Sequence, residues 1–222
     1  MMKRAVRTAI LLLTIVVLCT SCGKKWKEKK YQLSDFGLSK NPVATVTFST
    51  GGVVKFELQF DQAPNTCLNF MYLANTGFYD GLTIQRVGAN YMVQGGDPKG
   101  DGTGGPNYRI EGEFTENRVK NTLKHVRGAV SMSRNVSSEV REDTELYDTE
   151  GSQFFFMLTD NRDLDGKYTV FGTVTEGLEV LDEISRVKVN KYNNPIETIY
   201  FEKIEVDTYG VEFPEPDTVK AR

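Results

Sequence analysis

Apolar and polar residues alternate strictly near the start of the main body of the chain. Apolar side chains occupy every second position from Ala44 to Phe48 and, after the pair Gly51-Gly52, again from Val54 to Phe60. A period of two is typical of a strand with one buried face, and a glycine pair between two such runs is typical of a tight turn. The sequence therefore predicts a β-hairpin between positions 43 and 60.

A helical pattern follows this hairpin. From Pro64 to Ala74 apolar residues recur at intervals of three and four, and Gly77 closes the segment. Proline in the first turn and glycine past the last turn are typical boundaries of a helix. Cys67 lies on the apolar side of this helix, so we expect an inert thiol in the core. A second, shorter helix is predicted at 178–184, where leucine and isoleucine recur with helical spacing.

The remaining apolar runs are short and predict strands. They cover residues 82–87, 91–94, 129–132, 153–158, 168–174 and 199–206. Many short strands with two isolated helices favour a closed or nearly closed antiparallel barrel over a doubly wound sheet. The pattern thus predicts a mainly β fold.

The first 22 residues have the features of a targeting signal. Three basic residues precede an apolar run from Ala9 to Cys19. That run is too short to cross a bilayer, which takes roughly 20 residues in a helix, so a secretory signal is the better interpretation. The segment ends in Thr20-Ser21-Cys22, which resembles a bacterial lipoprotein box and implies cleavage before Cys22 and lipidation of Cys22. An uncleaved signal anchor is the alternative.

These patterns divide the chain into four parts. We expect a signal peptide over residues 1–21, a lipidated Cys22 with a lysine-rich tether over 22–40, a folded domain over 41–207 and a loose tail over 208–222. The tether lysines either approach an anionic membrane surface or form a solvated spacer. The expected location is the bacterial cell envelope, with the protein held to a membrane by Cys22 and facing the periplasm.

Charge and composition exclude several functions. The chain has 27 basic and 30 acidic side chains, so no general basic field exists for a nucleic acid. One histidine and three cysteines do not suffice for a zinc site or a disulfide scaffold. The glycine-rich stretch 95–105 lacks the lysine of a phosphate loop, and residues 161–172 lack the glutamate of a calcium loop. We therefore predict no metal and no cofactor, and we interpret His125 as structural or solvated.

Two segments do carry a combination suited to binding. Arg86, Met92 and Gln94 lie at even spacing, although Gly88-Ala89 interrupts the extended chain between them. In the second segment, residues 151–156, Gln153 and Phe155 share one face of a predicted strand. A guanidinium and amides can donate hydrogen bonds to a carbonyl, while neighbouring apolar groups contact an apolar ring beside that carbonyl.

These segments resemble the cyclophilin family of peptidyl-prolyl isomerases. The similarity runs from Val43 to Val206 and rests on four blocks in the family's order, at residues 86–97, 128–134, 151–156 and 164–172. It implies a closed eight-stranded antiparallel barrel capped by two α-helices. It also implies isomerisation of X-Pro bonds, with proline-containing polypeptides as partners. We expect the protein to be a monomer.

The resemblance implies a role for each matching residue. Arg86 matches the catalytic arginine, and three groups match the surfaces that bind substrate. The wall of the proline pocket corresponds to Tyr91, Met92, Phe155 and Leu164, the groove amides to Gln94 and Gln153, and the strip beside the preceding residue to Ser133, Arg134 and Asn135. Tyr168 is a further expected substrate-binding residue. Three positions depart from common family members, since Tyr91 replaces phenylalanine, Asp163 replaces tryptophan and Tyr168 replaces histidine.

The implied chemistry is rotation of an amide bond. Its barrier is about 18–20 kcal/mol, because resonance must be broken. A donor such as Arg86 can stabilise the rotated state in an apolar, water-poor pocket. The alternatives are a non-catalytic module or chaperone that holds proline-containing segments, and a purely structural envelope lipoprotein. The acidic stretch 135–150 either borders the groove or is a solvated loop.

Overall fold

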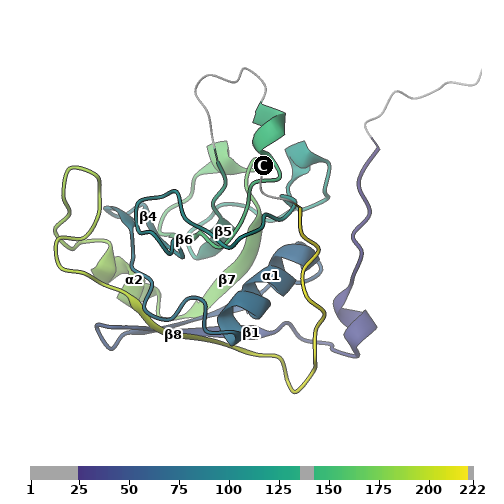
Figure 1. The fold of residues 1–222 in the computed structure, drawn as a ribbon, viewed down its shortest axis with the longest axis horizontal. Helices are drawn as coiled ribbons and strands as arrows, with labels where there is room; N and C mark the ends of the chain where they lie inside the picture. Colours follow the sequence, from purple (N-terminus) through teal and green to yellow (C-terminus); the bar gives the residue numbers. More distant parts are fainter. Residues whose placement is uncertain (1–24, 136–142, 220–222) are drawn as a thin grey trace, which may run out of the picture.

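One antiparallel sheet curls around a core of aromatic side chains (Figure 1). The computed structural model describes residues 25–135 and 143–219, so the expected signal and Cys22 lie outside the described residues. The strand order is β3-β4-β6-β5-β7-β2-β1-β8. The strands are β1 (Val43–Phe48), β2 (Val53–Leu58), β3 (Arg86–Gly88), β4 (Met92–Gly95), β5 (Ala129–Met132), β6 (Phe154–Met157), β7 (Val170–Glu176) and β8 (Phe201–Asp207), and the α-helices are α1 (Pro64–Asn75) and α2 (Leu178–Ile184).

The alternation in the first hairpin produces the predicted buried face. In β1 and β2 every second residue is buried, from Ala44 to Phe48 and from Val54 to Leu58. Helix α1 lies between the two arms of the curled sheet, and its Phe70 contacts the rings of Phe56 and Phe154 with centroids 5.3 Å apart. Cys67 is fully buried on the same helix, and burial raises the pKa of its thiol, as an inert core cysteine requires.

The predicted closed barrel is wrong, because the sheet is open between β3 and β8. The predicted strand 82–87 forms a ladder only from Arg86 onward, and its first half meets β8 through the isolated bridge of Thr83 with Tyr200. The free edge of β3 is bonded instead by the loop that joins α2 to β8, where the carbonyl of Asn193 accepts from the N–H of Val87 at 2.8 Å. This loop occupies the place that a closing strand pair would take.

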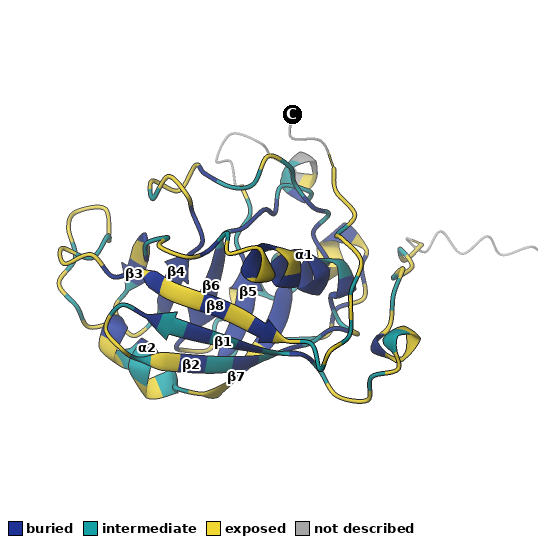
Figure 2. Cartoon of the chain, turned by 60° about the horizontal axis from the view of Figure 1, so that its bottom comes forward, coloured by how far each residue is buried: buried dark blue, intermediate teal, exposed yellow. Residues whose placement is uncertain are grey.

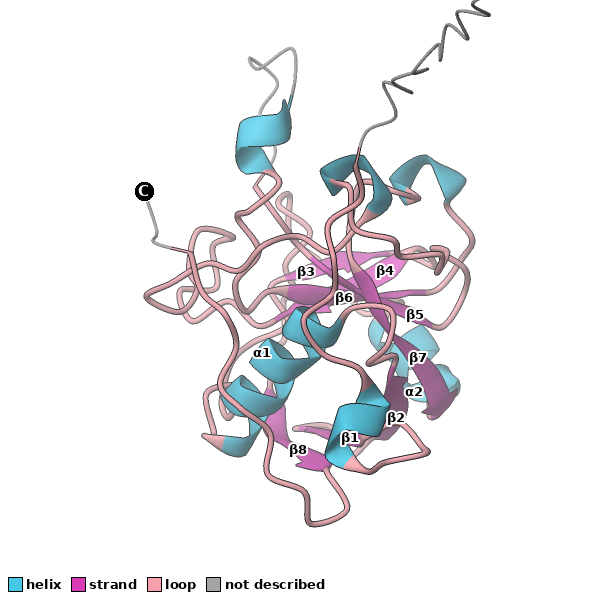
Figure 3. Cartoon of the chain, turned by 90° about the vertical axis from the view of Figure 1, so that its right-hand side faces the viewer, coloured by secondary structure: helices cyan, strands magenta, loops and turns pink. Residues whose placement is uncertain are grey.

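The segments before β1 and after β8, for which the sequence predicted a tether and a loose tail, pack on the domain in the described part of the chain. The backbone N–H of Lys27 donates to Arg118, and Lys30 forms an ion pair with Asp217 at 2.8 Å. The ring of Phe36 lies 4.6 Å from that of Phe213. Figure 3 shows the amino-terminal segment running down the side that faces the viewer, beside α1. Apolar rings and paired charges therefore fix both segments.

Helix α1 receives its amino-terminal cap from a distant carboxylate. Glu113, which is buried, accepts hydrogen bonds from the backbone N–H and hydroxyl of Thr66 at 2.7 and 2.8 Å, and a longer one from Asn65. The first N–H groups of a helix lack partners within the helix, and the helix dipole favours a negative charge there. Burial nevertheless raises the pKa of Glu113 to about 7. Among the described residues, no helix is long and apolar enough to cross a membrane.

Replacing Phe213 with alanine tests the docking of the tail. We expect Phe213→Ala to lower the free energy of unfolding by about 1–2 kcal/mol, below the roughly 3–5 kcal/mol of a fully buried phenylalanine, because this ring is half-buried. Urea denaturation measures the change. Glu215→Ala, at an exposed position of the same segment, serves as the control and keeps wild-type stability. Equal stability of the two variants would show that the tail is loose after all.

Because burial raises the pKa of Glu113, we expect the free energy of unfolding to fall as the pH rises. Its pKa is 4.5 in the unfolded chain and about 7 in the fold, so the folded state binds more protons between these values. The free energy of unfolding therefore decreases as the pH rises from 5 to 7, by about 2–3 kcal/mol from this group. We expect Glu113→Gln to reduce that decrease, measured by urea denaturation at both values. The exposed carboxylate of Glu197 supplies the control, Glu197→Gln, and an identical pH dependence of both variants would contradict the assignment.

Candidate functional site

The central strands of the sheet are buried on both faces. In β4, β5 and β6 every residue is buried, and these strands are dark blue in Figure 2. Val93, Phe154 and Phe156 belong to the main core, whereas Met92 and Phe155 belong to a second, smaller cluster. Because neighbouring side chains of a strand point to opposite faces, that second cluster lies on the outer face of the sheet.

Strand pairing assembles one row of side chains on this outer face. Arg86 pairs with Gln94, Gln94 pairs with Phe155, and Phe155 pairs with Ser131. Directly opposed residues have their side chains about 4.5–5.5 Å apart at Cβ. The even spacing of Arg86, Met92 and Gln94 in the sequence thus acts across a hairpin, since Arg86 lies in β3 and the other two lie in β4.

A cavity of about 260 Å³ opens beside this row. The side chains of Met92 and Phe155, each 5% exposed, provide apolar wall, while Arg86 is exposed at the edge. Nine of the residues identified from the sequence line the cavity, namely Arg86, Tyr91, Met92, Gln94, Ser133, Arg134, Phe155, Leu164 and Tyr168. Its composition combines an apolar surface with a few polar donors, as small binding sites usually do.

The two other predicted site residues lie next to the cavity. Gln153 accepts from the side-chain amide of Gln94 at 3.1 Å, and its own amide donates to the carbonyls of Gly102 and Gly104. Gln153 therefore fixes both Gln94 and the glycine-rich loop. Asn135 lines a neighbouring hollow of about 30 Å³, together with Gln153, Ser133 and Arg134.

The glycine-rich stretch has a structural explanation in this region. Gly96 has a φ of +88°, and a Cβ there would lie 2.4 Å from the carbonyl oxygen of Ser152. The side-chain hydroxyl of Ser152 donates to the carbonyl of Gly96 at 2.6 Å. Glycine is thus needed at position 96 both for the positive φ and for the close approach of the two backbone segments that flank the site.

His125 supports the wall of the cavity from behind. It is fully buried, so the alternative of a solvated histidine is wrong. Its Nδ1 lies 3.2 Å from a carboxylate oxygen of Asp165, and its Nε2 lies 3.0 Å from the hydroxyl of Ser131. The imidazole stacks on Phe155 with centroids 6.2 Å apart. Burial lowers the pKa of His125, and Asp165 opposes that shift.

Arg134 is held on the rim of the cavity by aromatic rings. Its guanidinium carbon lies 4.9 Å from the ring centre of Tyr168, 5.2 Å from that of Tyr147 and 5.7 Å from that of Phe114. Its Nε donates to the carbonyl of Lys167 at 2.8 Å. Contacts of a guanidinium with ring faces are favourable, so this cation has a fixed position at the edge of the site.

The acidic stretch 135–150 is not uniformly solvated. Glu150, its last member, is fully buried, and its Oε1 accepts from the hydroxyl of Thr169 at 2.6 Å. Its Oε2 has no hydrogen-bond partner in the described part of the chain. Burial raises the pKa of Glu150 well above its usual range. Residues 136–142 of the stretch lie outside the described residues.

Sequence reasoning missed two residues that brace the predicted ones. Asn161 donates through its side chain to the hydroxyl of Tyr91 at 2.8 Å, which gives that extra hydroxyl a partner. Gln85, which is buried, lies against the amide of Gln153. Gln85 directly precedes Arg86, and this adjacency is the signal that the sequence offered for it. Asn161 lies three residues before Leu164, and its role follows from the tertiary contact with Tyr91. Among residues 25–135 and 143–219, no group of three or more His, Cys, Asp or Glu is placed to hold a metal ion.

Comparison with known proteins agrees with this geometry. The family model described as cyclophilin type peptidyl-prolyl cis-trans isomerase/CLD matches residues 44–206. A peptidyl-prolyl cis-trans isomerase of Helicobacter pylori (strain ATCC 700392 / 26695) is 40% identical over 175 residues, which cover 78% of this chain and 94% of the relative. Peptidyl-prolyl cis-trans isomerase-like 1 of Mus musculus is 35% identical over 148 residues, covering 67% of this chain and 82% of the relative.

A solved structure shows the same fold. The crystal structure of a Cryptosporidium parvum cyclophilin-type peptidyl-prolyl cis-trans isomerase, determined in the presence of the dipeptide Ala-Pro, superposes with a TM-score of 0.64 and 29% sequence identity. The match covers 75% of this chain and 99% of that one. Residues 44–206, which the family model matches, contain the whole cavity and every strand of the sheet except the ends of β1 and β8. The chain therefore belongs to the cyclophilin family of peptidyl-prolyl cis-trans isomerases.

Proposed function

We propose that this isomerase acts through Arg86 on X-Pro bonds whose proline ring enters the 260 Å³ cavity. As the C–N bond twists, resonance is lost and the nitrogen becomes pyramidal, with an exposed lone pair. The guanidinium of Arg86 donates a hydrogen bond to that nitrogen. Met92 and Phe155 hold the ring and exclude water from the twisting bond.

The observation that carries this proposal is the cross-strand row from Arg86 to Phe155. It puts a cation and an apolar ring on one face, two strands apart. Within the described part of the chain, no residue accepts a hydrogen bond from the Arg86 guanidinium, so its donors are available to a substrate. Gln94, fixed by Gln153, presents an amide between them. A donor already in place needs no reorganisation during the reaction, and this is what makes such donors effective.

A neutral imidazole behind the pocket fits this mechanism. Bond rotation needs no nucleophile and no proton transfer, and burial lowers the pKa of His125, which stacks on Phe155. The catalytic group is a guanidinium, whose planar fork of N–H donors can bind a lone pair without the help of a base. We therefore infer a mechanism that depends on the position of one cation rather than on its ionisation.

We propose further that the enzyme is anchored to the cell envelope through lipidated Cys22 and assists the folding of envelope proteins there, facing the periplasm. The support is the basic and apolar signal followed by Thr20-Ser21-Cys22. Lipidation contributes about 0.8 kcal/mol per buried methylene, and two or more chains anchor a protein stably. The packing of the segment from Lys27 onward on the domain leaves a short connection between Cys22 and the isomerase.

Substitution of Arg86 tests the mechanism. We expect Arg86→Ala to lower kcat/KM by roughly 10²–10³-fold, the cost of removing a preorganised donor at a developing charge. We expect Arg86→Lys to fail as well, since an ammonium lacks the planar fork. A protease-coupled assay with a prolyl peptide measures the rate, and exposed Arg186→Ala is the control. Wild-type rates for both Arg86 variants would remove the role of Arg86, and peptide binding without any acceleration by the wild type would favour the non-catalytic module.

Substitution of Cys22 tests the anchor. In the full-length chain expressed in a Gram-negative host, Cys22→Ala should abolish incorporation of labelled palmitate and release the protein from the membrane fraction. Cys19→Ala, three residues earlier, is the matched control and should leave both unchanged. If Cys22→Ala instead remains in the membrane with its amino terminus uncleaved, the segment is a signal anchor.

A further inference from the structure

The strand that carries Arg86 is short and lies at the edge of the sheet. β3 has three residues and is the first member of the strand order, so among the described strands it forms a ladder with β4 alone. Backbone groups at a sheet edge have no ladder partner, and a pair of short strands alone is marginally stable. The position of the guanidinium therefore depends on what holds the other edge of β3.

The loop between α2 and β8 holds that edge on both sides of Arg86. The carbonyl of Asn193 accepts from the N–H of Val87 at 2.8 Å, one residue after Arg86. The side-chain amide of Asn194 donates to the carbonyl of Gln85 at 2.5 Å, one residue before it. Figures 1 and 2 show this loop, residues 188–196, at the left end of the molecule beside the strands that line the site.

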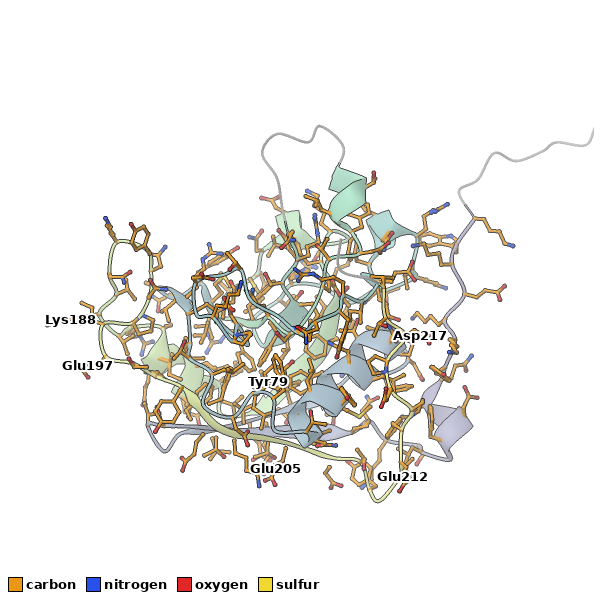
Figure 4. The ribbon with its side chains drawn as sticks, in the orientation of Figure 1. Tyr79, Lys188, Glu197, Glu205, Glu212 and Asp217 are labelled. Atoms are coloured by element: carbon orange, nitrogen blue, oxygen red, sulfur yellow. The ribbon has the colours of Figure 1, made fainter. Side chains whose placement is uncertain are left out.

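The loop is itself braced, so it can act as a rigid support. The side-chain oxygen of Asn190 accepts from the N–H groups of Tyr192 and Asn194 at 2.8 and 3.1 Å. At the base of the loop, the N–H of Ile196 donates to the carbonyl of Lys188. Figure 4 labels Lys188 and Glu197 at this base. These contacts close a small hairpin around the two asparagines.

Asparagine suits both contact positions. Asn193 has a φ of +66°, a left-handed conformation that asparagine adopts more readily than most residues. Asn194 needs a side-chain donor of short reach, because its own backbone N–H is already bonded to Asn190. The segment Val189–Pro195 thus combines a brace, a left-handed turn and a donor directed at β3.

We propose that Asn193 and Asn194 are positioning residues that set the place of the Arg86 guanidinium through the backbone of β3. The proposal rests on the catalytic role of Arg86 stated above. A displacement of about 1 Å at a reacting group can cost up to roughly 10²-fold in rate, even when its cause lies away from the chemistry. The apolar wall of the cavity comes from β4 and β6, so the proline ring should still bind when the loop contact is lost.

The test is Asn194→Asp, which keeps the size of the side chain but removes its donor. We expect kcat to fall about tenfold, while the dissociation constant of an Ala-Pro peptide, followed by NMR titration, stays within twofold. The Nε–H resonance of Arg86 should shift in the free enzyme. Tyr192→Ala, at an exposed position of the same loop, should keep wild-type kcat and the wild-type resonance. If Asn194→Asp fails to fold, Asn194→Ala removes the same donor without adding charge.

A double-mutant cycle separates positioning from general stability. In an Arg86→Ala background, Asn194→Asp should cause no further loss of rate, because the group that it positions is already gone. An equal loss in both backgrounds, or unchanged kcat in the wild-type background, would overturn the positioning role. Wild-type activity of Arg86→Ala alone would overturn the proposed mechanism and this inference with it, and that result is distinct from the other two.

Discussion

The register between β3, β4, β6 and β5 is the constraint on which the site depends. It aligns Arg86, Gln94, Phe155 and Ser131 across four strands on one face. A slip of one residue in any pair would turn the row toward the core, because side chains alternate between the faces of a sheet. Large side chains on the inner face, such as Phe154 and Phe156, oppose that slip by filling the core. Core packing therefore fixes the geometry of the candidate site.

A site on the outer face of a sheet must be built from loops as well as strands. The outer cluster around Met92 and Phe155 would be wet without the segments that bear Leu164 and Tyr168. Their positions are fixed by polar contacts beneath the surface, chiefly those of His125 with Asp165 and Ser131. Rigid support of this type is what a mechanism based on a placed donor requires, since the chemistry gains nothing from a cation that moves.

The buried carboxyls reveal a second constraint. Glu113 caps α1 and Glu150 lies beside it in the interior, and burial raises the pKa of both. Each is linked to Thr169, since the N–H of Glu113 donates to the Thr169 hydroxyl, which in turn donates to Glu150. Strand β7 begins one residue after Thr169. The helix and the sheet are thus joined by a polar connection that costs stability when its acids ionise, while the aromatic core supplies the stability that offsets it.

The sequence by itself determined the hairpin of β1 and β2 and helix α1, because local periodicity reports directly on which face a side chain occupies. The residues around the cavity followed from the resemblance of four sequence blocks to the cyclophilin family. The sequence did not determine the open edge between β3 and β8, the docked tail or the burial of His125 and Glu150. Each of these depends on contacts between segments far apart in the chain, such as Phe36 with Phe213 and Asn194 with Gln85. Polar residues and a proline-rich end look solvated in a sequence. Only the tertiary structure shows which partner takes the place of water.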